Sequence, residues 1–338
     1  MCEAARFLEV LLRDGHVHGR RAHLVPMDGG VSSAIYLVED GASKFVVKRA
    51  LEKLRVRDNW FADVSRNTNE QNYLEYVSRL IPGVVPQVYF SSKDSNYFGM
   101  EYLGPNFTTW KQLLFEGGFR MRHAELAGTI LGTIHSQTAF NETLLKQFDT
   151  TANFHQLRVE PYLLTTGARH PALGAFFDAE AQRIEATRES LVHGDFSPKN
   201  ILIHGERMVV LDCEVAWYGD PVFDVAFLLN HLLLKSLHHP SSVLAARSTV
   251  NAFWDAYVQK QSDAHARQIE ERLTPLLLML LLARVDGKSP VEYLRPAEQN
   301  FIRNFVYEHL PSPPESLAGI CDFWFAQVPA FKITEVDT

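Results

Sequence analysis

The sequence contains few cysteines and no excess of basic residues. Its 338 residues include three cysteines, Cys2, Cys213 and Cys321, which lie far apart and form no Cys-x-x-Cys pair. An odd number of distant cysteines argues against a disulfide framework and against a zinc site, and it fits a reducing compartment. Lysine and arginine number 33 against 40 aspartate and glutamate residues, which gives a net charge of −7. Because nucleic-acid-binding proteins usually carry a basic excess, we expect no nucleic-acid partner.

Long hydrophobic runs and low-complexity segments are also missing. The longest apolar run, Leu276–Ala283, is too short to cross a bilayer and is followed at once by Arg284. We therefore predict that this run forms a buried core helix. The N-terminus, from Met1 to Arg6, has the pattern of an amphipathic helix and lacks the basic and apolar regions of a signal peptide. These features predict a cytoplasmic protein with no membrane segment.

The first third of the chain is rich in predicted strands. Short apolar runs predict strands at 35–38, 44–48, 88–90 and 98–102, and a helical face predicts one helix at 67–80. Asp40-Gly41 predicts a hairpin turn between the first two strands. Hydrophobic residues make up 46% of the chain, which is enough for one large core or two joined lobes.

The remainder of the chain has a mainly helical pattern. It predicts helices at 124–135, 224–237, 248–261 and 272–284, interrupted by a short hairpin at 201–211. The predicted fold class is therefore α+β, with a small β-rich N-terminal lobe, 1–104, that ends in a hinge, and a larger helical C-terminal lobe, 105–338. A cleft between two lobes is a common place for a ligand.

The strongest chemical signal is the segment 193–200, His-Gly-Asp-Phe-Ser-Pro-Lys-Asn, followed by two short strands and Asp212. Phosphoryl transfer to a hydroxyl needs a carboxylate that orients the hydroxyl and takes its proton, and Asp195 fits this role. A divalent metal on a triphosphate needs hard oxygen ligands, which Asn200 and Asp212 supply from the two ends of a tight hairpin. A lone His-Gly-Asp is usually a turn with a capping aspartate, but the whole arrangement is more specific for this chemistry.

With these residues the chain resembles the aminoglycoside phosphotransferase and choline kinase family, which is related to the protein kinases. The resemblance covers roughly residues 20–300 and is most specific at 191–231. It implies a two-lobed, protein-kinase-like fold and transfer of the γ-phosphoryl group of ATP or GTP, with Mg²⁺, to a hydroxyl of a small molecule such as an aminoglycoside, a sugar or an amino alcohol. Gly194 stands where protein kinases have the arginine of His-Arg-Asp, as is usual in the small-molecule branch.

The resemblance also implies a nucleotide site in the N-terminal lobe. Lys48 ends an apolar strand and matches the lysine that contacts the α- and β-phosphates and pairs with a helix glutamate, although such a lysine can also simply reach solvent. Glu70 is the expected partner, with Glu75 as the alternative. The turn at 28–33 departs from Gly-x-Gly-x-x-Gly, but its glycines and serines can still approach phosphates. The expected nucleotide-binding residues are Gly29, Gly30, Ser32, Ser33, Lys48, Glu70, Met100, Glu101 and Leu103, the last three at the hinge beside the base.

Other residues have less certain roles in this comparison. The resemblance implies that Asp224 braces the catalytic loop, and it could also cap the apolar helix that follows it, since the two roles are compatible. Glu214 matches a second family acid that either tunes the metal or binds substrate. We expect the acceptor near Trp217, Tyr218 and the helices beyond residue 250. His238 and His239 are expected at a solvated helix end. Two alternatives remain: a catalytically silent kinase-like protein that binds a nucleotide or a partner, and a protein kinase.

Overall fold

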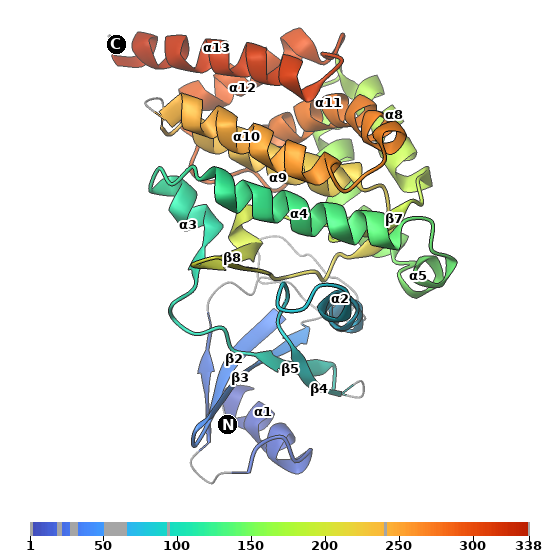
Figure 1. The fold of residues 1–338 in the computed structure, drawn as a ribbon, viewed down its shortest axis with the longest axis vertical. Coiled ribbons are helices and arrows are strands. Elements are labelled where there is room, and N and C mark those ends of the chain that lie inside the picture. The colour runs from blue at the N-terminus through green and yellow to red at the C-terminus, as the bar shows by residue number, and fades with distance from the viewer. Residues whose placement is uncertain are drawn as a thin grey trace. The chain divides into compact units, whose positions relative to one another are not determined.

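The computed structural model describes residues 3–18, 22–27, 33–50, 66–92, 95–239 and 242–336 (Figure 1). The backbone divides into two compact units, Met1–Phe107 and Thr108–Thr338. The first is built around a sheet and the second is mainly helical, so the predicted α+β fold class is confirmed.

The first unit contains one five-stranded antiparallel sheet in the order β1-β2-β3-β5-β4. Its strands are β1 (His23–Pro26), β2 (Ser33–Asp40), β3 (Ser43–Ala50), β4 (Val88–Ser92) and β5 (Tyr97–Glu101), and its helices are α1 (Glu3–Arg13) and α2 (Arg66–Leu80). The predicted hairpin is present, with Asp40 opposite Ser43 and Gly41 in the left-handed region at φ +64°. The amphipathic N-terminal helix is also present, and it buries Phe7 and Leu11 against the sheet.

The second unit contains two small sheets among many helices. Strands β8 (Ile201–His204) and β9 (Arg207–Val210) form the predicted hairpin, extended by β6 (Thr108–Thr109), while β7 (Ser190–Val192) pairs with β10 (Trp217–Gly219). The helices are α3 (Trp110–Phe115), α4 (Met121–Thr138), α5 (Glu142–Gln147), α6 (Thr151–Phe154), η1 (His155–Leu164), α7 (Thr165–Arg169), α8 (Gly174–Ala186), η2 (Pro198–Asn200), α9 (Val222–Ser236), α10 (Val243–Val258), α11 (Asp263–Asp286), α12 (Pro296–His309) and α13 (Leu317–Val336).

Helices α4, α9, α10 and α11 form the core of this unit (Figure 1). Every residue of α9 is buried, and the apolar run Leu276–Ala283 lies buried within α11, as the sequence predicts. Helix α10 packs closely on α4, because Gly128 and Gly132 have no side chain to push its backbone away. Within the described ranges, no helix is long and apolar enough to cross a membrane.

Candidate active site

A tight hairpin places the predicted metal ligands side by side. The chain leaves β7, passes through the segment 193–197 and the single turn η2, and then forms β8 and β9. The N–H of Leu211 donates to the carbonyl of Asn200 at 2.8 Å, so Asn200 and Asp212 flank the open end of this hairpin. Asp212 adopts φ +62°, an uncommon backbone conformation for a residue other than glycine. Uncommon backbone conformations of this kind cluster at functional sites.

The donor set at this hairpin suits a hard divalent cation. The amide nitrogen of Asn200 donates to the carbonyl of Asp195 at 3.0 Å, which leaves the amide oxygen as its metal-binding atom. Carboxylate oxygens of Asp212 and Glu214 lie within 4.8 Å of each other. An amide oxygen and carboxylates are the ligands that Mg²⁺ and Ca²⁺ take in proteins. The residues present therefore fit Mg²⁺, and Glu214 is close enough to contribute to its site.

Asp195, the predicted base, is buried between two cations. Its Oδ2 lies 3.2 Å from Nη2 of Arg158 and 3.1 Å from Nζ of Lys199. The Lys199 side chain is about half exposed, and the Asp195 carboxylate raises the pKa of its ammonium. Both cations contact the same carboxylate oxygen, and these charge-assisted contacts restrict its orientation.

Arg158 is the site residue that sequence reasoning missed. It lies on η1, a π-helix that contains Pro161, and besides Asp195 it donates to the carbonyls of Gly194 and of Leu157, the latter at 2.6 Å. Burial alone would lower the pKa of its guanidinium, but Asp195 and, further away, Glu214 and Asp212 raise it. A π-helix has no simple sequence signature, and Arg158 lies 37 residues before Asp195, so no local pattern could have identified this contact.

Asp224 braces the backbone of the catalytic segment. Its two carboxylate oxygens accept from the N–H groups of His193 at 2.7 Å and Gly194 at 2.9 Å. The additional role, helix capping, is wrong, because Asp224 lies inside the first turn of α9 and Asp220 accepts the N–H of Val222 instead, at 3.0 Å. One buried carboxylate thus fixes the two residues that precede Asp195.

The imidazole of His193 also holds the catalytic segment in place. Its Nδ1 accepts from the N–H of Asp195 at 3.1 Å, and its Nε2 donates to the carbonyl of Leu211 at 3.1 Å. This pattern requires the neutral ring. Burial lowers the pKa of His193, which favours the same neutral form. The ring therefore ties the segment before Asp195 to the segment before Asp212.

Position 194 requires glycine in this fold. Gly194 has φ +78°, and a Cβ there would lie 2.7 Å from the carbonyl oxygen of Val215. Both the backbone conformation and the lack of space exclude a side chain. The arginine that protein kinases carry in this triplet could not fit, which gives a physical reason for the glycine.

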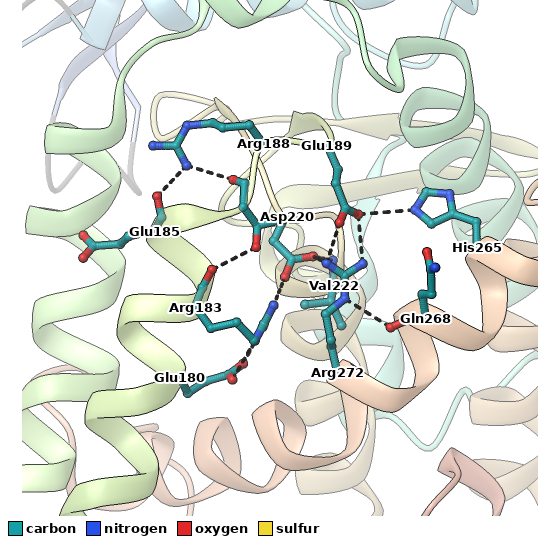
Figure 2. Close-up of polar contacts among 11 residues, drawn as sticks. Glu180, Arg183, Glu185, Arg188, Glu189, Asp220, Val222, His265, Gln268 and Arg272 are labelled. Carbon is teal, nitrogen blue, oxygen red and sulfur yellow. Dashed lines mark hydrogen bonds and ion pairs between the residues drawn. The ribbon is translucent and has the colours of Figure 1, made fainter.

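A polar network anchors the junction between β10 and α9 (Figure 2). Asp220, which is fully buried at this junction, pairs with Arg183 of α8 and, at 3.2 Å, with Arg272 of α11. Arg272 also donates twice to Glu189, at 2.7 and 2.8 Å, and Arg183 donates twice to Glu180. The network joins α8 and α11 to the strand pair of β7 and β10. The catalytic segment follows β7, and α9 follows β10.

Glu189 is the acid of this network with the largest described change in pKa. Burial opposes its charge, but hydrogen bonds from His265 and Arg272 outweigh burial and lower the pKa of Glu189 to about 2. The backbone of Glu189 also takes part in holding this junction together, because its N–H donates to the carbonyl of Gly219 at 3.0 Å. Glu189 therefore stays ionised throughout the neutral range and holds Arg272 in place.

In the first unit, Lys48 pairs with Glu70 and not with Glu75. The Lys48 ammonium lies 2.9 and 2.7 Å from the two carboxylate oxygens of Glu70, and both side chains are 3% exposed. Glu75 instead accepts from Gln71 at 2.6 Å. The solvent-reaching alternative for Lys48 is therefore wrong. A buried lysine and glutamate on β3 and α2 form the pair that the family resemblance implies.

The other predicted nucleotide-binding residues are only partly described. Ser33 is buried at the start of β2, whereas Gly29, Gly30 and Ser32 lie outside the residues that the structure describes. Met100 and Glu101 end β5, and the N–H of Glu101 donates a hydrogen bond to the carbonyl of Gln87 at 2.9 Å. Leu103 follows the strand, where the chain leaves the sheet. Adenine binding at these positions stays a prediction.

Two further predictions concern residues outside the hairpin. Trp217 and Tyr218 are buried, and the indole stacks on Phe154 with ring centroids 4.1 Å apart, while an acceptor site near them stays a prediction. The Tyr218 hydroxyl lies among backbone groups, for example 2.8 Å from the carbonyl of Thr138. His238 and His239 lie directly after the end of α9, as expected, and are half-buried, with His239 bonding the Phe115 carbonyl at 2.8 Å.

Comparison with known proteins identifies the class. The model of the phosphotransferase enzyme family, APH, matches residues 23–237, which is more than half of the sequence. The chain belongs to this family. Its protein-kinase-like fold recurs in an amicoumacin kinase solved with AMP-PNP, Ca²⁺ and Ami (TM-score 0.51, 15% identity, 91% of this chain and 95% of that one). It recurs also in a choline/ethanolamine kinase family protein from Mesorhizobium loti (TM-score 0.51, 16% identity, 97% and 99%).

Among curated proteins, the chain is similar to several methylthioribose kinases. It is 24% identical over 267 residues to the enzyme of Escherichia coli, covering 70% of this chain and 60% of that protein. It is 25% identical over 228 residues to methylthioribose kinase 1 of Oryza sativa, covering 59% and 53%. The matches therefore span less than two thirds of the length of these relatives.

Proposed function

We propose that this protein transfers the γ-phosphoryl group of ATP, with Mg²⁺, to a hydroxyl of a small molecule. The observation that carries the proposal is the hairpin geometry, in which Asn200 and Asp212 lie side by side and Asn200 is bonded to the backbone of Asp195. Phosphoryl transfer depends mainly on positioning and charge neutralisation, and this arrangement provides both. Membership of the phosphotransferase family supports the same reaction.

Each residue has a proposed part in this reaction. Asp195 orients the acceptor hydroxyl and takes its proton, while Arg158 and Lys199 keep the carboxylate in position. Asn200 and Asp212 hold Mg²⁺, which neutralises charge on the phosphates when it is bound. Lys48 contacts the phosphates and is held by Glu70.

The acceptor is proposed from the similarity to methylthioribose kinases. Methylthioribose is therefore the first acceptor to test, together with other sugars, amino alcohols and aminoglycosides. Phosphate transfer to any of these hydroxyl compounds would establish a small-molecule kinase. Transfer to generic protein substrates would instead support the protein-kinase alternative.

The first experiment is a thermal-shift titration with ATP and with GTP, each with and without Mg²⁺. A ligand that binds the native state raises the unfolding midpoint by mass action. We expect a Mg²⁺-dependent shift in the wild type and its loss in Asp212→Ala. Asp178→Ala, at an exposed position on α8, is the matched control and should behave as the wild type. Absence of any nucleotide shift in the wild type would contradict the proposal.

Turnover separates the kinase from a silent binding protein. Nucleotide consumption is measured with the acceptor panel, and a product must form that contains the transferred phosphate. A Mg²⁺-dependent shift without turnover for any acceptor would favour the binding protein.

A further inference from the structure

The second unit contains a buried lysine without an acidic partner. Lys235 of α9 is 2% exposed, and its ammonium lies over the rings of Phe115 and Tyr293, 5.3 and 5.0 Å from their centroids. Its polar contact among the described residues is the Tyr293 hydroxyl at 3.4 Å. Within the ranges that the structure describes, no carboxylate forms an ion pair with it. A buried ammonium without a counter-ion is costly and calls for an explanation.

Two further basic groups lie near Lys235, and in the described part of the chain neither forms an ion pair with an acid. Arg284 of α11 donates from Nη1 to the Tyr162 hydroxyl at 3.0 Å and to the Ser289 side chain at 3.1 Å, and its buried Nε has no hydrogen-bond partner among the described residues. His231, one turn before Lys235 on α9, is buried and its Nδ1 likewise has no partner there. Lys235 and Arg284 are both close enough to His231 to lower its pKa, after burial itself.

The charge of Glu292 acts on Lys235 but does not neutralise this group. Glu292 is exposed and already pairs with Lys111 at 2.6 Å. Burial, followed by Lys111 and Arg284, lowers the pKa of Lys235 to about 7. An anion bound beside Lys235 would raise its pKa again, against the effects of burial, Lys111 and Arg284, and would thereby favour the charged ammonium.

The basic group shares an aromatic neighbour with the partner of the catalytic carboxylate. The guanidinium groups of Arg158 and Arg284 both lie over the ring of Tyr162, 5.8 and 5.6 Å from its centroid. Arg158 is the residue that pairs with Asp195. Both arginines lie in the same unit as the hairpin, and so does Lys235.

We propose that Lys235, Arg284 and His231 form a subsite for an anionic group, a carboxylate or a phosphate, of the acceptor molecule. This inference rests on the proposed function, because it names the class of acceptor for the same site. The subsite disfavours a cationic acceptor, because the protein's own ammonium already occupies the aromatic faces of Phe115 and Tyr293 that could hold a ligand cation. Polycationic aminoglycosides and choline are therefore poor acceptors in this proposal.

Anion binding can be measured without any phosphoryl transfer. Isothermal titration with inorganic phosphate and with succinate tests the two sources of negative charge. We expect at least one of them to bind the wild type, and to bind Lys235→Met and Arg284→Gln about tenfold to a hundredfold more weakly, since a hydrogen bond to a charged group is lost. Lys288→Met, which removes an exposed lysine that pairs with Glu160 at 2.5 Å, is the matched control and should bind as the wild type.

The competing binding place is the predicted phosphate clamp at Lys48. Anion binding that is lost in Lys48→Met and retained in Lys235→Met would overturn the subsite. Equal binding to the two subsite variants, to Lys288→Met and to Lys48→Met would overturn it as well. Removing a buried charge and substituting an apolar chain should leave Lys235→Met folded. Its thermal midpoint and its nucleotide shift check this, and Arg284→Gln gives a second, polar substitution.

Acceptor kinetics separate this inference from the proposed function. If the inference holds, anionic hydroxyl compounds are better acceptors than neutral ones of the same size, and Lys235→Met removes that preference. If neutral methylthioribose is the best acceptor and its KM is the same in Lys235→Met, the subsite is wrong while the kinase activity stands. If no acceptor is phosphorylated but anions still bind through Lys235, the proposed function fails and the anion site stands.

Discussion

Asp195 shares one carboxylate oxygen between the buried guanidinium of Arg158 and the partly exposed ammonium of Lys199. The backbone around it is fixed as well, by Asp224 on the N-terminal side and by Asn200 through the Asp195 carbonyl. A group held from so many directions loses little entropy when a substrate hydroxyl binds to it. This residue therefore has the positioning that a catalytic base requires.

Replacing Asp195 by asparagine tests its role as the base. The amide keeps the size of the carboxylate but cannot take the proton, so we expect turnover to fall by about two to four orders of magnitude. The nucleotide shift in thermal unfolding should remain. Steady-state kinetics of Asp195→Asn, with Asp178→Asn at the exposed α8 position as control, measures the effect. Near wild-type turnover in Asp195→Asn would place the base elsewhere.

Arg158 is a positioning residue in this view, and its loss should affect both stability and turnover. Arg158→Met leaves the buried Asp195 with Lys199 alone, and removing one partner of a buried pair costs about 3 kcal/mol. We expect kcat to fall while KM for the nucleotide stays the same, which a general loss of folding would not produce. Arg158→Lys should recover part of kcat, since it restores the charge.

Urea unfolding and steady-state kinetics of the two Arg158 variants give both quantities. Arg169→Met is a suitable control, because this exposed arginine bonds only the carbonyls of Asp286 and Gly287 among the described residues. A normal kcat in Arg158→Met would show that Lys199 alone positions the base.

At the scale of elements, α9 connects the catalytic segment with the basic group. Its first turn carries Asp224, which bonds His193 and Gly194, and its last turns carry His231 and Lys235. All 15 of its residues are buried, so its position depends on the polar network at its N-terminus as much as on apolar packing. Asp220 belongs both to that network and to the start of the helix.

Asp220→Asn should therefore destabilise the second unit. The amide can still accept the N–H of Val222, but Arg183 and Arg272 lose a buried counter-charge, which costs about 3 kcal/mol. Urea unfolding measures the change. The control is Glu206→Gln, which breaks the exposed pair with Arg122 and should cost less than about 1 kcal/mol. Equal effects of the two substitutions would show that the network contributes no more than a surface pair.

At the scale of the whole molecule, buried histidines set the response to acid. Burial lowers the pKa of His193 and, more strongly, that of His231. In the unfolded chain both have a pKa of about 6.5, so below that pH the unfolded state binds more protons than the native state. Their contribution to stability is complete above about pH 6.5 and declines as the pH falls below it.

Because burial lowers the pKa of Lys235 to about 7, stability already declines as the pH falls toward 7, and we expect the histidines to make the thermal midpoint fall further from about pH 6.5 to 5, before most carboxylates titrate. Thermal unfolding followed by circular dichroism across this range measures the decline. His231→Leu removes one of the two groups and should make the decline shallower. A midpoint that stays constant down to pH 5 would contradict the assignment of these histidines as neutral and buried.

Much of the fold followed from patterns that are local in the sequence. The helix predicted at 67–80 and the hairpin predicted at 201–211 correspond to α2 and to β8 and β9, because amphipathic periodicity and turn residues act over a few positions. Boundaries were less accurate where packing extended an element. Helix α11 begins at Asp263, capped by Ser262, and continues past Pro275, whereas the pattern predicted a start at 272.

The sequence by itself determined the hairpin between Asn200 and Asp212, because its two short strands and the turn between them are local in the chain. It determined the buried run in α11 for a similar reason, since eight consecutive apolar residues must avoid water. Only the tertiary structure decided that Lys48 pairs with Glu70, that Arg158 holds Asp195, and that Lys235 lies buried without an acid. These contacts join residues far apart in the chain, and their formation depends on how whole helices pack, which no local pattern specifies.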